Sequence, residues 1–267
     1  MLLARVYYVL CGALGQRLRD AKYSSVRVVE HDGELRVRKR RSFYAPLLVS
    51  LGHPLVRILD TGVRVLPQRA WEERERLMYE RLYDRSIRID ADGTLVLPRL
   101  AGRTLATVLE DPALGASDRK RAIELAVIAL ADFHARGFTH GDAMAENVMV
   151  DLEAGIARWF DFETVHDPNR PLAWRRADDV RALLATSLVR TAPAEFAETL
   201  YHIADVYADD AIMPHLMTSF TSVWRRSLPF HLGQAPLPYQ AFRLIDRLLR
   251  GRLTRVAADH TLLRRAL

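Results

Sequence analysis

Cysteine is almost absent from the sequence, which has Cys11 alone among its 267 residues. A single cysteine excludes an internal disulfide and a cysteine-rich zinc cluster. The sequence also lacks any apolar run of the roughly 18 residues that a helix needs to span a bilayer. We therefore expect a protein of the reducing cytoplasm, and contact of its basic helices with the inner membrane surface stays open as an alternative.

Lysine is scarce as well: Lys22, Lys39 and Lys120 are the only lysines among 39 basic residues. The net charge of +6 and the sequence pI near 9.7 nevertheless predict attraction to anionic partners, such as nucleotides, phosphorylated sugars, acidic lipid or nucleic acid. Nucleic acid ranks last among these partners, because no basic–aromatic module accompanies the charge.

The most informative stretch of the sequence runs from 138 to 163. Its two apolar runs, 148–150 and 156–160, flank the segment Asp-Leu-Glu-Ala-Gly and predict a β-hairpin. Polar residues stand at both outer ends of this hairpin: His140, Asp142 and Asn147 before it, Asp161 and Glu163 after it. An antiparallel pair brings its outer ends together, so we expect Asn147 and Asp161 to be neighbours in space.

The chemistry of this grouping is that of phosphoryl transfer. Asn and Asp oxygens are hard ligands for Mg²⁺, which bridges the phosphates of ATP, so Asn147 and Asp161 are the candidate metal ligands. Asp142 stands on a loop that can fold over the same point, and it is the candidate base that orients an attacking hydroxyl and takes its proton. Any one of these carboxylates could be a plain turn residue; the joint pattern favours a site.

This stretch resembles the catalytic and metal-binding loops of the protein kinase-like superfamily, where His-x-Asp-x-x-x-x-Asn is followed by Asp-Phe-Gly. Here the pattern is His140-Gly-Asp142-Ala-Met-Ala-Glu-Asn147 and then Asp161-Phe-Glu163. The His-Gly-Asp form and the glutamate after Asp-Phe are more similar to aminoglycoside phosphotransferases and bacterial lipopolysaccharide (Kdo and heptose) kinases. The resemblance implies an α+β, two-lobed kinase-like fold: a small antiparallel-sheet N-lobe over residues 1–97 and a mainly helical C-lobe over 98–267.

A second hairpin is predicted over 26–39, with Asp32-Gly33 as its turn. Alternation places Leu35, Val37 and Lys39 on one face of its second strand. In the superfamily a strand lysine holds the α- and β-phosphates of ATP, and an apolar residue two positions before it faces adenine, so the resemblance gives these roles to Lys39 and Val37. An edge-strand lysine that discourages aggregation is the alternative.

The next predicted helix spans 68–83, and the resemblance implies that it supplies a glutamate to pair with the strand lysine. Apolar residues should follow that glutamate at three, four and seven positions. Glu75 meets this pattern and is preferred to Glu73, although a solvated charge among helical ion pairs is the alternative. A hairpin over 87–97 then leads into Pro98-Arg-Leu100, which resembles the hinge that reads the adenine edge, so Pro98 and Leu100 join the candidate ATP contacts.

Two residue assignments concern the support of the catalytic loop. By resemblance, Asp178 or Asp179 at a helix start holds the backbone of that loop; the alternative is an ordinary carboxylate favoured by the helix dipole. We expect His140 to be a core histidine that braces the loop. A helix capped by Ser117 and ending near Ala135 should deliver the chain to this point.

Three further segments have less specific patterns. Residues 1–19 predict an amphipathic helix, which we expect to pack on the body of the protein, with a membrane surface as the alternative. Residues 43–66 predict a broken helical insertion. Residues 242–267 are arginine-rich, which indicates a solvated basic face or a surface for an anionic partner.

Departures from the superfamily pattern shape the functional prediction. No Gly-x-Gly-x-x-Gly loop precedes Lys39, Met144 stands where protein kinases place a phosphate-contacting lysine, and Gly141 replaces their arginine. We therefore predict an ATP- and Mg²⁺-dependent kinase that phosphorylates a hydroxyl of a sugar, glycolipid or other small molecule. The alternatives are a pseudokinase or an atypical Ser/Thr protein kinase with a regulatory role; a nucleic-acid-associated protein ranks last.

Overall fold

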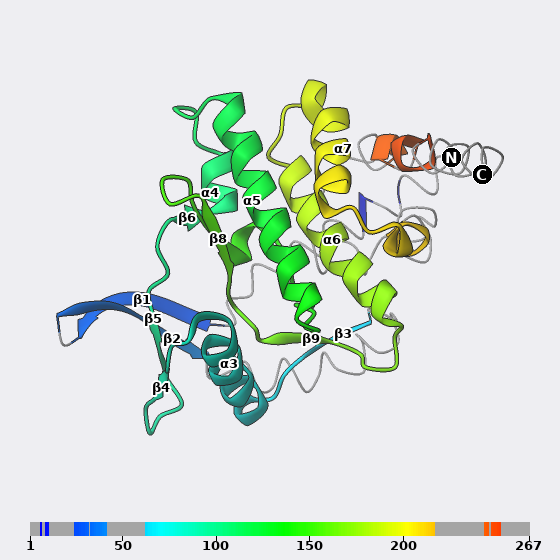
Figure 1. Ribbon diagram of the computed structural model, residues 1–267. Helices are drawn as coiled ribbons and strands as arrows, with labels where there is room; N and C mark the ends of the chain where they lie inside the picture. Colours follow the sequence, from blue (N-terminus) through cyan, green and yellow to red (C-terminus); the bar gives the residue numbers. More distant parts are fainter. Residues whose placement is uncertain are drawn as a thin grey trace.

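The computed structural model describes residues 24–31, 33–41, 62–216, 243–245 and 247–251, together with Val6, Val9 and Leu10. An antiparallel sheet and one helix form the N-terminal part of the described chain, and a mainly helical region follows it (Figure 1). The predicted α+β class, with a small antiparallel sheet before a helical region, is confirmed. The division into lobes at residues 97 and 98 stays a prediction.

The N-terminal sheet has four strands in the order β1-β2-β5-β4. The predicted hairpin forms its edge, with Val28 opposite Val37 and a turn that uses Gly33 at a φ of 75°. A positive φ suits glycine because it has no Cβ to clash with the backbone. The strands are β1 (Ser24–His31), β2 (Glu34–Arg41), β4 (Arg88–Ile89) and β5 (Leu95–Pro98).

Helix α3 (Gln68–Tyr83) forms where the sequence predicts it. Its buried side chains recur at helical spacing, which is the period that brings residues onto one face. These side chains are Trp71, Glu75, Met78 and Tyr79. A glutamate on this otherwise apolar face needs a buried cationic partner, so the burial pattern points to the site described below.

The helical region contains a second small sheet, in the order β6-β7-β8. The predicted hairpin around 151–155 is present, with Val148 opposite Trp159. The strands are β6 (Arg103–Thr104), β7 (Val148–Asp151) and β8 (Ile156–Trp159). The helices are α4 (Leu105–Leu109), α5 (Ala116–Ala135), α6 (Leu172–Leu188) and α7 (Phe196–Tyr207), with short 3₁₀ turns η1 (Ala145–Asn147), η2 (Pro193–Glu195) and η3 (Asp210–Ile212).

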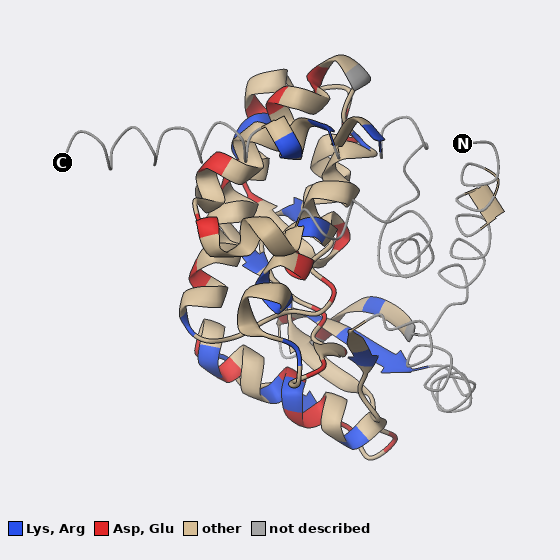
Figure 2. Ribbon diagram, turned by 90° about the vertical axis from the view of Figure 1, so that its right-hand side faces the viewer, with Lys and Arg blue, Asp and Glu red and all other residues tan. Residues whose placement is uncertain are grey.

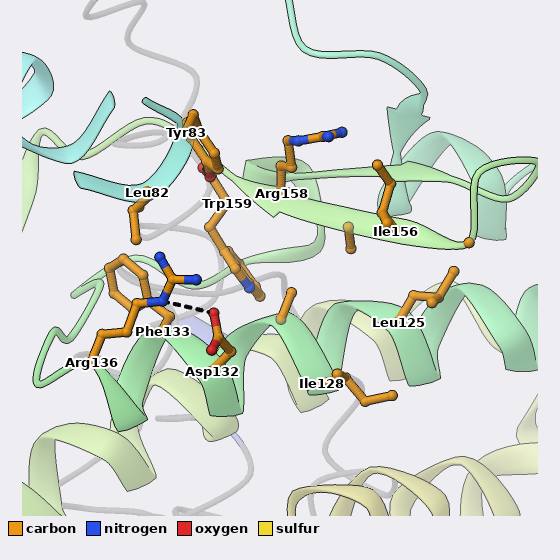
Figure 3. Close-up of a pocket in the computed structure, with 13 residues that line it drawn as sticks. Leu82, Tyr83, Leu125, Ile128, Asp132, Phe133, Arg136, Ile156, Arg158 and Trp159 are labelled. Atoms are coloured by element: carbon orange, nitrogen blue, oxygen red, sulfur yellow. Dashed lines mark hydrogen bonds and ion pairs between the residues drawn. The ribbon is translucent and has the colours of Figure 1, made fainter. Parts of the chain in front are cut away.

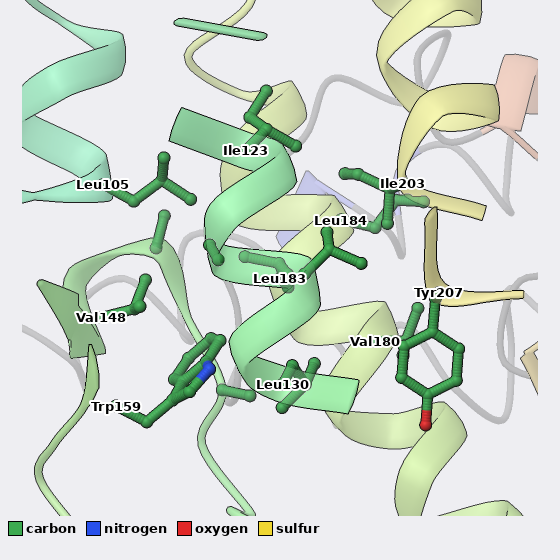
Figure 4. Close-up of a cluster of buried hydrophobic side chains, with 14 of the residues drawn as sticks. Leu105, Ile123, Leu130, Val148, Trp159, Val180, Leu183, Leu184, Ile203 and Tyr207 are labelled. Carbon is green, nitrogen blue, oxygen red and sulfur yellow. The ribbon is translucent and has the colours of Figure 1, made fainter. Parts of the chain in front are cut away.

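The main core lies where α5, α6 and α7 pack together beside the β7–β8 hairpin (Figures 1 and 4). Its fully buried side chains include Leu105, Leu130, Val148, Leu183, Leu184 and Ile203. Burial of this apolar surface holds the hairpin against α5, and the polar ends of the hairpin are thereby held in place.

A two-stranded ribbon links the N-terminal part to the helical region. Strands β3 (Val63–Val65) and β9 (Thr164–His166) pair antiparallel, and the N–H of Leu66 donates to the carbonyl of Glu163 at 2.8 Å. The chain just before α3 is therefore bonded to the chain just after Asp161. The predicted helical insertion over 43–66 is wrong at its end, because 63–65 form β3; residues 42–61 lie outside the described part.

One other prediction needs correction. Helix α5 begins at Ala116 after Gly115, without a side-chain cap, so Ser117 lies inside the first turn. Of the predicted N-terminal helix only Val6, Val9 and Leu10 are described; they are helical, and their side chains are 48–63% exposed. The packing of this helix on the body stays a prediction. Most of 242–267 lies outside the described residues.

Basic and acidic residues are distributed over both parts of the described chain (Figure 2). Among the described residues, no helix is long and apolar enough to cross a membrane.

Candidate active site

Lys39 occupies the centre of a charged cluster between the N-terminal sheet and the helical region. Its side chain is 5% exposed, and its ammonium is ion-paired with Asp161, 3.6 Å from Glu75 and 3.7 Å from Glu163. Burial alone would lower the pKa of Lys39, but the three carboxylates raise it above its ordinary value; in decreasing order of effect they are Asp161, Glu75 and Glu163. Lys39 therefore stays charged, and the edge-strand alternative does not apply to a buried lysine.

Glu75 is fully buried, whereas Glu73 on the same helix is exposed. One Glu75 oxygen accepts hydrogen bonds from the indole N–H of Trp71 at 3.1 Å and from the backbone N–H of Phe162 at 3.2 Å. Glu75 thus connects α3 to the segment that carries Asp161. The structure places Glu75, rather than Glu73, beside Lys39.

Asp161 follows strand β8 with a φ of 68°, which is the left-handed region. Few non-glycine residues adopt this conformation; Asp is enriched among them, and such strain clusters at functional sites. The next residue, Phe162, is fully buried and packs against the rings of Phe133 and His140, at centroid distances of 5.9 Å and 5.2 Å. This anchoring holds the turn that directs the Asp161 carboxylate at Lys39.

Asp142 and Asn147 are joined across the loop that connects them. The Asn147 amide Nδ2 donates to the backbone carbonyl and to the carboxylate of Asp142, both at 2.9 Å. Burial of the carboxylate, followed by the negative charges of Asp161 and Glu163, raises the pKa of Asp142 well above its ordinary value. The predicted proximity of the hairpin ends is present in the backbone, because the N–H of Phe160 donates to the carbonyl of Asn147 at 3.0 Å.

The loop before Asp142 is held by Asp179. Its carboxylate accepts hydrogen bonds from the backbone N–H groups of His140 and Gly141, each at 2.8 Å. The other candidate, Asp178, is directed elsewhere and pairs with His166 and Arg181. The structure thus places Asp179 in the contact that the sequence left open between two neighbours.

His140 lies in the core as predicted. It is fully buried, its Nε2 lies 3.0 Å from the carbonyl of Phe160, and its Nδ1 accepts from the backbone N–H of Asp142 at 3.3 Å. Burial lowers the pKa of His140 to about 4, so the ring is neutral near pH 7. A neutral ring with both nitrogens engaged braces the loop and carries no proton to a substrate.

Strand alternation and pairing gather the candidate adenine contacts on neighbouring strands. Val37 lies opposite Leu97, and Pro98 lies opposite Arg36 on the adjacent strand. Pro98 and Leu100 are buried, and Val37 is half-buried against the same core. Their contact with a nucleotide stays a prediction.

Two residues of the cluster were given no role from the sequence. Glu163 contacts Lys39 and lies 3.8 Å from Arg41, and the Arg41 guanidinium lies over the Trp71 ring at 4.4 Å from its centroid. Arg41 shares the strand face of Lys39 by simple alternation, so the period of two could have identified it. Nothing local predicts that Trp71 lies beneath it.

The donor set fits Mg²⁺ in its chemistry. The Nδ2 of Asn147 is engaged by Asp142, so the amide is oriented with its Oδ1 on the opposite side, and Asp161 and Glu163 supply carboxylates nearby. No cluster of three or more His, Cys, Asp or Glu ligands occurs among the described residues. Two carboxylates and an amide suit Mg²⁺, which keeps waters and phosphate oxygens as its other ligands.

Two cavities lie away from this cluster. One, of about 340 Å³, is lined by the end of α3, by α5 and by β8, where the Tyr83 hydroxyl donates to the carbonyl of Trp159 (Figure 3). The other, of about 530 Å³, is lined by the first turns of α5 and α7 and by Arg190. Neither is lined by Lys39, Asp142 or Asp161.

Comparison with known proteins gives only distant similarity. No protein-family model matches the chain, and no curated protein sequence matches it. Among solved structures, the chain is similar to Rad53 1–466 in complex with AMP-PNP, with 13% identity, a TM-score of 0.37 and coverage of 80% of this chain. It spans 62% of that Rad53 chain.

A second solved structure is a MAP kinase from Leishmania major, determined as a complex. Its identity is 15% and its TM-score is 0.39, over 88% of this chain and 80% of that chain. We therefore base the proposed function on the geometry of the charged cluster.

Proposed function

We propose that the protein is an ATP-dependent phosphotransferase that transfers the γ-phosphate to a hydroxyl of a sugar, glycolipid or other small molecule. The observation that carries this proposal is the convergence of Lys39, Glu75 and Asp161. These residues come from a strand, a helix and a loop that are far apart in the sequence, and they meet at one ammonium group. Phosphoryl transfer depends on positioning and charge, and this buried cluster supplies both.

Each residue has a role in this proposal. Lys39 binds phosphate oxygens of ATP, and Glu75 positions the lysine. Asp161 and Asn147 hold Mg²⁺, which when bound neutralises charge on the phosphates. Val37, Pro98 and Leu100 contact the adenine.

Asp142 orients the acceptor hydroxyl and takes its proton. The hydrogen bond from Asn147 fixes the direction of its carboxylate.

The segment after Asp161 supports a small acceptor rather than a folded protein. It is bonded to β3 as strand β9, and α6 begins at Leu172, so little chain is left to dock a peptide. Gly141 has a φ of 84°, and a Cβ there would lie 3.1 Å from the backbone of Val165. The arginine with which protein kinases read a phosphorylated loop would be strained at that position.

One observation favours a second candidate, a nucleotide-binding regulatory protein without turnover. The β1–β2 hairpin that leads to Lys39 closes with His31 opposite Glu34, so its turn is too short to cover phosphates. The buried Lys39–Glu75 pair and the ordered Asp142–Asn147 pair favour the enzyme.

Transfer of label from ATP into fractionated cell extract tests the proposal, with Asp142→Asn as the decisive variant. Turnover should fall by about 10²- to 10⁴-fold, while MgATP affinity stays unchanged, because the base contacts the acceptor and not the nucleotide. Asp151→Asn, at the end of strand β7 next to the hairpin turn, is the matched control and should keep parental turnover. Tight MgATP binding without turnover in any fraction would favour the regulatory protein, and turnover that survives Asp142→Asn would remove Asp142 from the mechanism.

A further inference from the structure

Arg41 is a buried cation at the edge of the charged cluster. It lies two residues after Lys39 on the same face of β2, and its side chain is 6% exposed. The Trp71 ring supports one face of its guanidinium at 4.4 Å, and NH1 donates to the carbonyl of Leu66 at 2.6 Å. These contacts fix the plane and the orientation of the guanidinium.

The opposite edge of the Arg41 guanidinium is unsatisfied. Both Nε and NH2 are buried and have no hydrogen-bond partner in the part of the chain that the structure describes. Oε2 of Glu163 is 3.8 Å from NH2, which is beyond hydrogen-bond distance, and it has no hydrogen-bond partner among the described residues either. Buried donors of a charged group are costly to leave without hydrogen bonds. A purely structural role accounts for the hydrogen bond of NH1, but it does not account for the unpaired Nε and NH2 groups.

The geometry of that edge indicates its ligand. The N–H of Nε and one N–H of NH2 point the same way and form the fork that binds two oxygens of a phosphate or carboxylate. Arg41 lies about 7 Å beyond Lys39 along strand β2. It therefore adds a second cation to the cluster, next to Glu163. The chain places no lysine after Asp142, where Met144 stands, so an additional cation from β2 would supply charge that the loop lacks.

We propose that Arg41 binds the phosphoryl group that is transferred, the γ-phosphate of ATP, through its Nε and NH2 groups. This inference rests on the proposed function and extends it. Lys39 holds the inner phosphates, Arg41 holds the outer one, and Trp71 keeps the guanidinium in plane. Arg41 positions the group against the Asp142 carboxylate and offsets its negative charge.

Nucleotide binding tests the proposal without turnover. Affinities for MgATP, MgADP and metal-free tripolyphosphate are measured by calorimetry for the parent, Arg41→Gln and Arg41→Lys. Arg41→Gln should weaken MgATP binding by about 10- to 100-fold and leave MgADP binding unchanged, because the lost hydrogen bonds join charged groups. Arg41→Lys, which keeps the charge without the fork, should recover part of the affinity.

Arg40→Gln is the matched control. It removes the same charge from the preceding residue of β2, whose side chain is 60% exposed on the other face of the strand and lies 3.4 Å from Asp92. This variant should bind both nucleotides like the parent. If Arg41→Gln does not fold, as judged by its thermal transition without ligand, the affinities of Arg41→Lys for MgATP and MgADP are compared with those of the parent instead.

The outcomes separate the two proposals. Equal loss of MgATP and MgADP affinity, or no loss, would overturn the γ-phosphate assignment, as would a raised acceptor KM with unchanged nucleotide affinity. If the parent binds no MgATP, the proposed function is wrong, and binding of tripolyphosphate then tests the role of Arg41. Tripolyphosphate binding that is weakened by Arg41→Gln supports the phosphate contact, and binding that is absent or unchanged in the variant overturns it.

Discussion

The carboxylate of Asp179 accepts a hydrogen bond from the backbone N–H of His140 at 2.8 Å, although the β7–β8 hairpin and β9 lie between them in the sequence. The same carboxylate accepts from Gly141 and lies 2.9 Å from Nε2 of His134. Burial alone would raise the pKa of Asp179, but these surroundings hold it below its ordinary value, with His166 as the largest opposing influence. Asp179 is therefore a buried charge that holds the loop at His140 and Gly141 onto α6.

The first prediction concerns this support. Asp179→Asn should lower the free energy of unfolding by about 3 kcal/mol, because an amide cannot accept all the hydrogen bonds that converge on the carboxylate. Urea denaturation followed by circular dichroism measures the change. The control is Asp132→Asn. The Asp132 side chain is 59% exposed and forms an ion pair with Arg136 one helical turn away, so this substitution should change the free energy of unfolding by less than about 0.5 kcal/mol. Equal effects at the two positions would contradict the buried role of Asp179.

The second prediction is a pH dependence that arises from His140. Its pKa in the folded protein is about 4, below the ordinary value of 6.5, so the unfolded chain binds a proton that the folded protein excludes. Stability from this group is therefore complete above about pH 6.5 and falls as the pH decreases towards 4, by up to about 3 kcal/mol.

Denaturation at several pH values, for the parent and for His140→Phe, measures this effect. Phenylalanine fits the ring cluster of Phe133, Trp159 and Phe162 but cannot titrate. The difference in stability between parent and variant should shrink or reverse as the pH falls from 7 to 4. A difference that is constant over this range would contradict the assignment.

The hairpins and helix α3 could be predicted because their signals are local. Asp32-Gly33 provides the turn of β1–β2, and alternation then fixes the face that carries Lys39. The β7–β8 pairing likewise brings Asn147 next to Phe160, the residue before Asp161, since antiparallel strands bring their outer ends together.

Other features depend on packing between distant segments. The sequence could not separate Asp178 from Asp179, because each residue turns a helix by about 100°, and only the rotation of α6 against the loop decides which carboxylate faces His140. The pairing of β3 with β9 could not be predicted from the sequence either. Val63–Val65 is too short for a periodic signal, and its partner strand lies far along the chain.

The third prediction tests the helix glutamate. Glu75→Gln should lower turnover by about 10²-fold, because Lys39 loses the charge that positions it, and misplacement by about 1 Å costs rates of this order. Glutamine keeps an Oε1 that accepts from Trp71 and Phe162, so the fold should persist. The exposed Glu73→Gln is the matched control, with the same change two residues earlier on α3. Parental turnover in Glu75→Gln, or an equal loss in both variants, would count against the Lys39–Glu75 pair.

The last prediction concerns Asp161 and metal. Asp161→Asn keeps a residue that tolerates the left-handed conformation observed at φ 68° and removes only the charge, so the fold should be retained. At a MgATP concentration of about 100 times the parental Kd, the parent should gain about 2.7 kcal/mol of stability. The variant should show the same nucleotide-dependent shift in Tm with Mg²⁺ as with a chelator, because its hard anionic ligand is gone. Asp142→Asn is the control: it changes a carboxylate to which the proposed function gives no metal contact, and it should keep the Mg²⁺-dependent part of the shift. If Asp161→Asn keeps the full MgATP shift of the parent, Asp161 is no metal ligand, and its contact with Lys39 is an ion pair alone.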